Sequence, residues 1–208
     1  TILWANDTVY VVGGIQHDGL APLPTIDAGY YLSNSYLDLG FRWDHNSDNK
    51  SQCRGLEVIT RAELTEWPLP GYDADPSFKG HGISHMHIGA TFNWGKLTVG
   101  DVYGQFGSGL VMRLYEDRAL GIDNALRGGK IEAKPYKGIY LTALGGKQRR
   151  NWNCYDDKAW GWNYKQDVVL GANIDLGLQE WIPQLQEAGA NLTIGGSYVS
   201  KYQKEDTI

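Results

Sequence analysis

The sequence has little of what marks several large classes of protein. Its 208 residues include only two cysteines, two methionines and four phenylalanines. Cys53 and Cys154 lack the Cys-x-x-Cys spacing of zinc and redox motifs, and the predicted strand count places them near opposite rims, which argues against a disulfide between them. No run of about 18 apolar residues occurs, which excludes a transmembrane helix but not membrane strands. The basic residues are dispersed and the net charge is −5, so we expect no nucleic-acid partner.

Motifs that carry catalysis are also missing. No Ser-His-Asp elbow, phosphate-binding loop or dinucleotide fingerprint occurs in the chain. We therefore predict no catalytic residues, no cofactor and no enzymatic activity. Carboxylates such as Glu57 and Glu63 could pair for glycoside hydrolysis, but that pairing depends on a geometry that the sequence does not contain.

What the sequence has in abundance is strict alternation of apolar and polar side chains. Positions 37–44 read Leu-Asp-Leu-Gly-Phe-Arg-Trp-Asp. Successive side chains of a strand point to opposite faces, so such a segment has one apolar face and one polar face. The alternation predicts a single all-β domain over residues 1–208. The expected strands cover residues 10–16, 30–44, 54–66, 84–94, 96–115 with a bulge at 107–109, 125–135, 138–150, 164–178 and 191–202, and a short helix is expected within 179–189.

Several features favour a transmembrane β-barrel over a β-sandwich. The expected strands run to about 11–15 residues, which is long for a sandwich but suits tilted membrane strands. Their polar faces are rich in Gly, Ser, Thr and Asn. Tight turns at Gly95 and at 136–137 contrast with long connections at 67–82 and 151–163, as in outer-membrane barrels. Aromatic residues are expected at strand ends, where an interfacial girdle would lie: Trp43, Trp67, Trp94, Trp152, Trp160, Trp162, Tyr164, Tyr198 and Tyr202. We predict an antiparallel up-and-down barrel, incomplete, with about nine or ten strands in this chain.

The densest group of charges forms the first candidate site. It lies on two neighbouring predicted strands and their connection, and it consists of Arg113, Glu116, Asp117, Arg118, Asp123, Arg127 and Lys130. Charged residues that face the lumen of a barrel set its width and its electric field, and so they tune which solutes pass. Alternatively, these charges pair with one another and brace the wall or an inward-folded loop.

Two histidines form a weaker candidate. His85 and His87 would share one face of a strand, about 7 Å apart from the rise per residue, which is close enough to bind one metal ion. A zinc site needs a third protein ligand, and His81 falls in a Gly-rich segment. The simpler interpretation is that both are polar residues on the polar face, and we predict no metal site.

A third candidate is an aromatic-rich connection. Trp152, Tyr155, Trp160 and Trp162 stand there among asparagines, and such rings stack on sugars while amides hydrogen-bond to hydroxyl groups. The same residues could equally form part of an interfacial girdle and a loop that packs on itself.

Several short sequence segments between residues 100 and 140 resemble those of a known protein family. They read Gly-Asp-Val-Tyr-Gly-Gln-Phe-Gly-Ser-Gly at 100–109, Arg-Leu-Tyr-Glu-Asp-Arg at 113–118, Leu-Gly-Ile-Asp-Asn-Ala-Leu-Arg-Gly-Gly at 120–129 and Pro-Tyr-Lys-Gly-Ile-Tyr at 135–140. The chain thereby resembles a family of uncharacterised outer-membrane β-barrel proteins from Gram-negative gut and oral bacteria. The resemblance implies a barrel fold and an outer-membrane location. It also implies a longer full-length chain, of which these residues would be the N-terminal part.

These observations lead to one predicted function and two alternatives. The prediction is an outer-membrane barrel whose partner is the lipid bilayer and which gives porin-like passage to small polar solutes or has a structural role. One alternative is a secreted β-sandwich that binds glycans through Trp152, Trp160 and Trp162. The other is a metal-dependent enzyme that uses His85 and His87.

Overall fold

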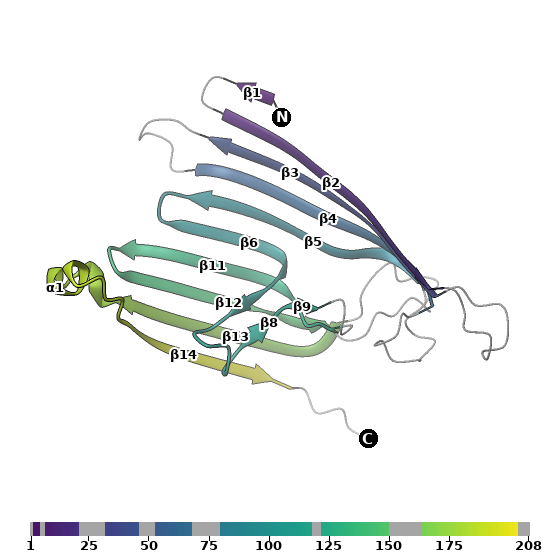
Figure 1. The fold of residues 1–208 in the computed structure, drawn as a ribbon. Helices are drawn as coiled ribbons and strands as arrows, with labels where there is room; N and C mark the ends of the chain where they lie inside the picture. The colour runs from purple at the N-terminus through teal and green to yellow at the C-terminus, as the bar shows by residue number, and fades with distance from the viewer. Residues whose placement is uncertain are drawn as a thin grey trace.

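The molecule is built on one large antiparallel sheet (Figure 1). The computed structural model describes residues 2–4, 7–20, 32–45, 53–67, 80–117, 122–149 and 164–203. The sheet has ten strands in the order β1-β2-β3-β4-β5-β6-β11-β12-β13-β14. Their bounds are β1 Ile2–Trp4, β2 Asp7–Leu20, β3 Leu32–His45, β4 Cys53–Trp67, β5 Gly80–Phe92, β6 Gly95–Val102, β11 Leu126–Tyr136, β12 Ile139–Arg149, β13 Tyr164–Gly177 and β14 Thr193–Tyr202.

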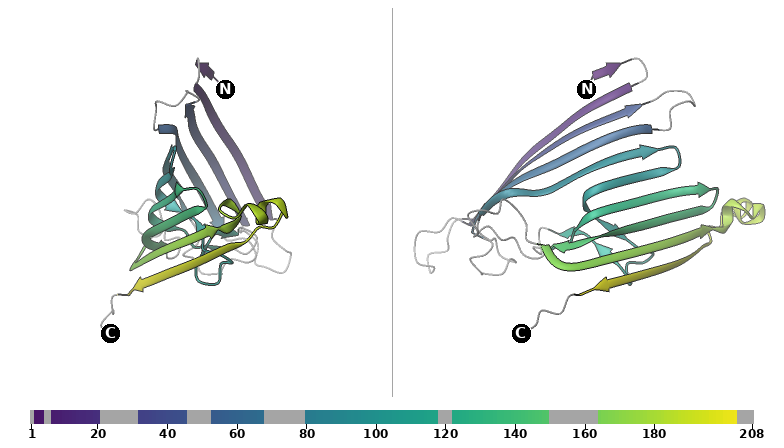
Figure 2. Two further views of the ribbon diagram at one scale, coloured as in Figure 1. Left: turned by 90° about the vertical axis from the view of Figure 1, so that its left-hand side faces the viewer. Right: turned by 180° about the vertical axis from the view of Figure 1, so that it is seen from behind.

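The prediction of an all-β chain is confirmed, and each strand pairs with its neighbour along the sheet. The sheet is open, because β1 forms one edge and β14 the other. The end-on view in Figure 2 shows that it is strongly curved. Among the described residues no pairing joins the two edges, so a closed barrel is not formed by this part of the chain.

The predicted long strand over residues 96–115 is wrong. Strand β6 ends at Val102, just after Gly100, whose φ of +121° is a conformation that glycine alone adopts readily. The chain then leaves the sheet as a segment of short strands: β7 Gly104–Gln105, β8 Arg113–Leu114, β9 Glu116–Asp117 and β10 Ile122–Asp123. We call residues 103–125 the strap, of which 103–117 and 122–125 are described.

The bulge predicted at residues 107–109 is a turn within the strap. Gly107 and Gly109 have φ values of +50° and +86°, and the Gly109 N–H donates to the Phe106 carbonyl oxygen at 2.8 Å. The turn reverses the chain between β7 and β8, which pair with each other. Glycine at these two positions therefore makes a reversal of direction, not an irregularity within a strand.

Two short helical elements connect β13 to β14, as predicted for residues 179–189. A 3₁₀ turn, η2 (Leu178–Glu180), is followed by α1 (Pro183–Glu187). Pro183 starts α1, where its fixed φ suits the first turn and its missing N–H has no consequence. In the part of the chain that is described, no helix is long and apolar enough to cross a membrane.

The two faces of the sheet differ sharply in chemistry. One, the apolar face, carries Phe41, Val58, Ile88 and Val99, which pair in register across β3 to β6. Each of these four side chains is at least 40% exposed. The polar face carries Arg42, Glu57, Gly89, Thr98 and Lys130, which follow one another across β3 to β11. The alternation in the sequence thus appears as two chemically distinct sides of one layer.

The buried core lies on the polar face, under the strap. It consists of Val102, Phe106, Met112, Leu126, Leu144 and Val169, with Leu114 and Val199 packed against it. Figure 1 shows the strap in front of β11 to β13. The apolar face, in contrast, has no second layer of described residues on it.

Aromatic side chains occupy strand ends only in part. Trp43 lies near the end of β3, Trp94 lies in the turn between β5 and β6, and Tyr202 ends β14. Tyr198, predicted at a strand end, is in the middle of β14 opposite Ala172. Tyr198 is therefore not at the strand end where the sequence predicted it, because β14 continues to Tyr202. The side chains of Trp67 and Tyr164 and the whole of residues 151–163 lie outside the described part.

Candidate functional site

Arg61 is the centre of an ionic cluster on the polar face. It projects from β4, where its Nε donates to Asp38 Oδ1 at 2.5 Å and its Nη2 donates to Asp38 Oδ2 at 3.1 Å. Its Nη1 donates to both carboxylate oxygens of Glu116, at 2.9 and 3.0 Å. A planar guanidinium can serve two carboxylates in this way because its donors point along fixed directions. Arg61 therefore joins β3, β4 and the strap.

A second cluster lies beside the first on β4 to β6. Glu57 contacts Lys96 Nζ at 2.5 Å and His87 Nε2 at 3.5 Å. His85 Nε2 and His87 Nδ1 lie 2.8 Å apart, so one of the two nitrogens must donate and the other accept. The two rings therefore cannot both be fully protonated while this hydrogen bond exists.

The strap touches this second cluster through Tyr103. The Tyr103 ring stacks on His85 with 5.4 Å between centroids and 3° between planes. Its hydroxyl donates to Asp123 Oδ1 at 3.1 Å, which ties the beginning of the strap to its end. The polar face thus holds the strap by an aromatic contact as well as by an ion pair.

Within the described part of the chain, no third ligand accompanies His85 and His87 in a metal-binding arrangement. In the described ranges, no group of three or more His, Cys, Asp or Glu side chains is arranged to hold a metal ion. His85 and His87 do lie on one strand and close together, as predicted, but they contact each other. His81 is exposed at the start of β5.

The predicted charge group is scattered over several contacts. Five described members contact partners outside the group: Glu116 contacts Arg61 at 2.9 Å, Arg127 contacts Asp101 at 2.6 Å, Lys130 contacts Glu132 at 3.1 Å, Asp123 contacts Tyr103 at 3.1 Å and Arg113 lies over the Tyr115 ring at 4.5 Å. Asp117 pairs with Ile122 in the β9–β10 hairpin. Arg118 lies outside the described residues. The contacts join the strap and neighbouring strands to one another.

Asp101 is a buried carboxylate that sequence reasoning missed. Its side chain has no exposed surface. It accepts from Arg127 Nε at 3.0 Å, from Arg127 Nη2 at 2.6 Å and from the Met86 backbone N–H at 2.8 Å. A buried carboxylate needs such partners, because leaving water without them is costly. The only signal in the sequence is an Asp at the end of an alternating segment.

A polar cluster fixes η2 to the hairpin of β11 and β12. The Tyr140 hydroxyl and Lys134 Nζ donate to the Glu180 carboxylate, the latter at 3.2 Å, and the Gly138 N–H donates to it at 3.0 Å. The hydrogen bond from Tyr140, and then that from Lys134, holds the pKa of Glu180 below its ordinary value against the opposing effect of burial. This cluster also was not predicted, because Glu180 is 40 or more residues away from Tyr140 and Lys134 in the sequence.

Trp152, Tyr155, Trp160 and Trp162 all lie outside the described residues, as does Cys154. Cys53 is half-buried at the start of β4.

Comparison with known proteins gives one family match. A family model described as a family of unknown function (DUF6029) matches residues 17–208. The chain belongs to this family. No curated protein and no solved structure matches it. The matched range contains all the sequence segments on which the resemblance depends. Membership in DUF6029 assigns neither a cellular location nor an activity to the chain.

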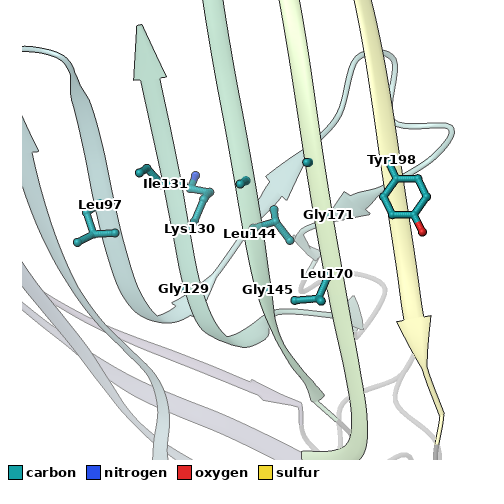
Figure 3. A pocket seen from close by; sticks show the side chains of 11 residues that line it. Leu97, Gly129, Lys130, Ile131, Leu144, Gly145, Leu170, Gly171 and Tyr198 are labelled. Atoms are coloured by element: carbon teal, nitrogen blue, oxygen red, sulfur yellow. The ribbon is translucent and has the colours of Figure 1, made fainter. Parts of the chain in front are cut away.

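The apolar face of this DUF6029 chain contains a shallow depression (Figure 3). Its floor is made by the small residues Gly129, Ala143, Gly145 and Ala172 on β11 to β13. Larger apolar side chains surround them, among them Leu97, Ile131, Leu170 and Tyr198, and the volume is about 460 Å³. The depression is open and almost wholly apolar, so it belongs to the same surface as the rest of the apolar face.

Proposed function

We propose that this chain forms the wall of an outer-membrane β-barrel. Its apolar face would contact acyl chains, and its polar face would line a passage for small polar solutes or the interior of a structural barrel. The observation that carries the proposal is a sheet of ten strands in one layer, with a continuous and exposed apolar face.

The extent of the apolar face supports a hydrophobic environment. Exposed large apolar side chains occur on strand after strand, including Leu39, Phe41, Leu56, Val58, Ile88, Val99, Leu170 and Ile174. Soluble proteins rarely expose apolar patches larger than a few hundred Å², since fully burying one such side chain stabilises by about 1.5–3 kcal/mol. A surface of this kind therefore needs an apolar partner, and a bilayer supplies one along the whole sheet.

Strand length supports the same proposal. Strands β2 to β5 and β13 have 13–15 residues, and β11 and β12 have 11. About 9–11 residues suffice for a tilted strand to cross the hydrocarbon region. The apolar band is also bounded. Val99, Gly129 and Gly145 form one row of this band, paired across β6, β11 and β12. The row two residues further along the strands is charged, and it consists of Asp101, Arg127 and Lys147.

The polar face supports an aqueous interior. Its charges are paired across strands, as in Lys96 with Glu57 and Lys201 with Asp167. Open sheet edges do not occur in the hydrocarbon region, because their N–H and C=O groups would have no partners. The proposal therefore includes further strands that pair with β1 and β14 and close the wall.

The experiment is reconstitution of the full chain. A barrel requires detergent or lipid to remain folded, migrates faster on a gel before heating than after, and resists proteases in vesicles. Swelling of vesicles in neutral sugars then distinguishes an open passage from a closed structural barrel. A folded monomer in detergent-free buffer would contradict the proposal and favour the glycan-binding sandwich, which calorimetric titration with oligosaccharides would test.

A further inference from the structure

The hairpin of β7 and β8 runs across the polar face toward the edge of the sheet. At its start, a Cβ on Gly104 would meet Leu144 Cδ2 of β12 at 3.0 Å. Two residues later Phe106 lies over Gly171 of β13, where a Cβ would meet Phe106 Cε2 at 2.7 Å. The next strand in this direction is β14, which forms the edge. Figure 1 shows the hairpin reaching across β13 toward β14, and Figure 2 shows it from behind.

The loop of the hairpin extends beyond β13. The Phe106 N–H donates to the Met112 carbonyl oxygen at 3.1 Å, so residues 107–111 form the loop. Neighbouring strands are about 4.8 Å apart, whereas half of a loop of this length spans about 8 Å. The tip of the hairpin therefore lies over β14, at the edge of the described sheet.

This tip is apolar, exposed and already shaped. Leu110 is 92% exposed and Val111 is 57% exposed. The Gln105 side chain braces the loop, because its Nε2 donates to the Gly107 carbonyl oxygen at 3.1 Å. A segment that is already ordered loses little conformational entropy when it binds. The tip thus offers two neighbouring apolar side chains in a fixed arrangement.

The apolar core continues beneath the hairpin up to this tip. One register row crosses β11 to β14, and it consists of Lys130, Leu144, Gly171 and Val199. The row is charged at β11 and becomes apolar toward the edge. Val199 packs against the core in which Phe106 and Met112 are buried. Apolar contact therefore extends without interruption from β12 to β14, and it stops where the sheet stops.

We propose that Leu110 and Val111 dock on a further strand that pairs with the edge of β14. This partner rests on the proposed function, in which such strands close the wall. Its inward-facing residue opposite Val199 is small or apolar, because it continues the row that starts at Leu144. The hairpin then joins the two sides of this seam, and Leu110 is buried there instead of facing a watery passage.

Truncation of Leu110 in the full chain, folded in detergent micelles, tests whether the tip is docked. Leu110→Ala should lower the equilibrium constant of folding at least about thirtyfold, as truncation of a buried leucine does. Ser108→Ala is the control, because Ser108 is exposed on the same tip, and it should change that constant less than about threefold. Urea unfolding measures both variants. An effect of L110A no larger than that of S108A would overturn the docking.

Hydroxyl-radical footprinting of the unaltered protein gives the answer if L110A does not fold. The oxidation rate of each side chain is compared between the folded protein and the chain unfolded in urea. Leu110 should be protected in the folded protein to the same degree as Met112, which is 6% exposed in the core. Oxidation of Leu110 at its unfolded rate, with Met112 protected, would overturn the docking.

Crosslinking from position 110 identifies the partner. A photoreactive diazirine analogue of leucine is placed there, and isotopically light and heavy copies of the full chain are mixed. Crosslinks should join position 110 to a strand outside residues 2–202 of the same copy. Crosslinks between copies, or crosslinks confined to residues 2–202, would overturn the proposed partner.

Gel mobility before and after heating separates this inference from the proposed function. A protein with heat-dependent mobility and a freely oxidised Leu110 would overturn the docking and leave the barrel in place. A monomer that stays folded without detergent would overturn the barrel wall and the docking together.

Discussion

Gly171 shows how one missing side chain can position a segment far away in the sequence. Its bare Cα leaves the space that the Phe106 ring fills. We expect Gly171→Ala to lower the free energy of unfolding by about 1–3 kcal/mol, because the methyl group overlaps the ring. Gly196→Ala is the control, since a Cβ there meets only Ile174 Cγ2 at 3.9 Å. Urea unfolding in detergent measures both, and equal effects would contradict the packing described.

The buried carboxylate of Asp101 should matter more than an exposed one in a similar pair. Asp101→Asn weakens two hydrogen bonds from Arg127 in a buried site, and we expect a loss of about 1–3 kcal/mol in unfolding free energy. Asp44→Asn breaks the exposed pair with Arg42 and should cost less than about 1 kcal/mol. Thermal unfolding of the two variants compares them directly. A larger loss in D44N would show that burial does not determine the strength of these pairs.

For individual residues, the sequence predicted on which face of the sheet a side chain lies better than it predicted which partners the side chain contacts. Alternation placed Arg61 on the polar side of its strand, but nothing in the chain indicates that its partners are Asp38 and Glu116. Glu116 is 55 residues away, and contacts across such a distance depend on register and on the path of the strap. The proximity of His85 and His87 was predictable, because residues two positions apart on a strand lie on the same face.

The element that joins β13 to β14 should respond to acid. The pKa of Glu180 lies below its ordinary value because Tyr140 and Lys134 donate hydrogen bonds to the ionised carboxylate. Its contribution to stability is therefore full above the unfolded pKa of about 4.3 and is lost as the pH falls through the lower folded pKa. A carboxyl NMR titration should find this low pKa.

The same titration has a matched pair of variants. Tyr140→Phe should raise the pKa of Glu180 toward its ordinary value. Trp181→Phe should not, because Trp181 Nε1 donates to the Lys137 carbonyl oxygen. An unchanged pKa in Y140F would show that the hydrogen bond from Tyr140 is not its cause.

The strap is the segment that the sequence analysis predicted wrongly, as part of one long strand. Residues 96–115 continue the apolar alternation, and period two alone cannot show that a strand has left its sheet. The decisive residues are glycines in left-handed conformations at 100, 107 and 109. The neighbouring strands β5 and β6 were predicted because their alternating patterns are separated by a clear turn at Gly95.

The whole sheet should tolerate charge on one face only. Arg in place of Ile88, on the apolar face, is expected to cost about 2–4 kcal/mol in a bilayer if the residue lies near the midplane. Thr91→Arg on the same strand and the opposite face should be nearly neutral. Unfolding in lipid vesicles measures the difference. Equal tolerance would indicate that the apolar face does not contact lipid.

Sequence patterning predicted the all-β chain of alternating strands, its two faces and the antiparallel order in which the strands follow one another. It also predicted an incomplete sheet of about nine or ten strands, and the described strands do leave β1 and β14 as open edges.

Spin labels on the two faces test the orientation of the sheet most directly. In a background without Cys53 and Cys154, labels would be placed singly at Ile88 and Leu170 on the apolar face and at Thr91 and Thr142 on the polar face, in the full chain reconstituted in vesicles. Labels at Ile88 and Leu170 should collide with lipid-dissolved oxygen, and labels at Thr91 and Thr142 with a water-soluble nickel complex. Labels at Ile88 and Leu170 that are reached by the nickel complex, or by neither reagent, would contradict a lipid-facing apolar surface.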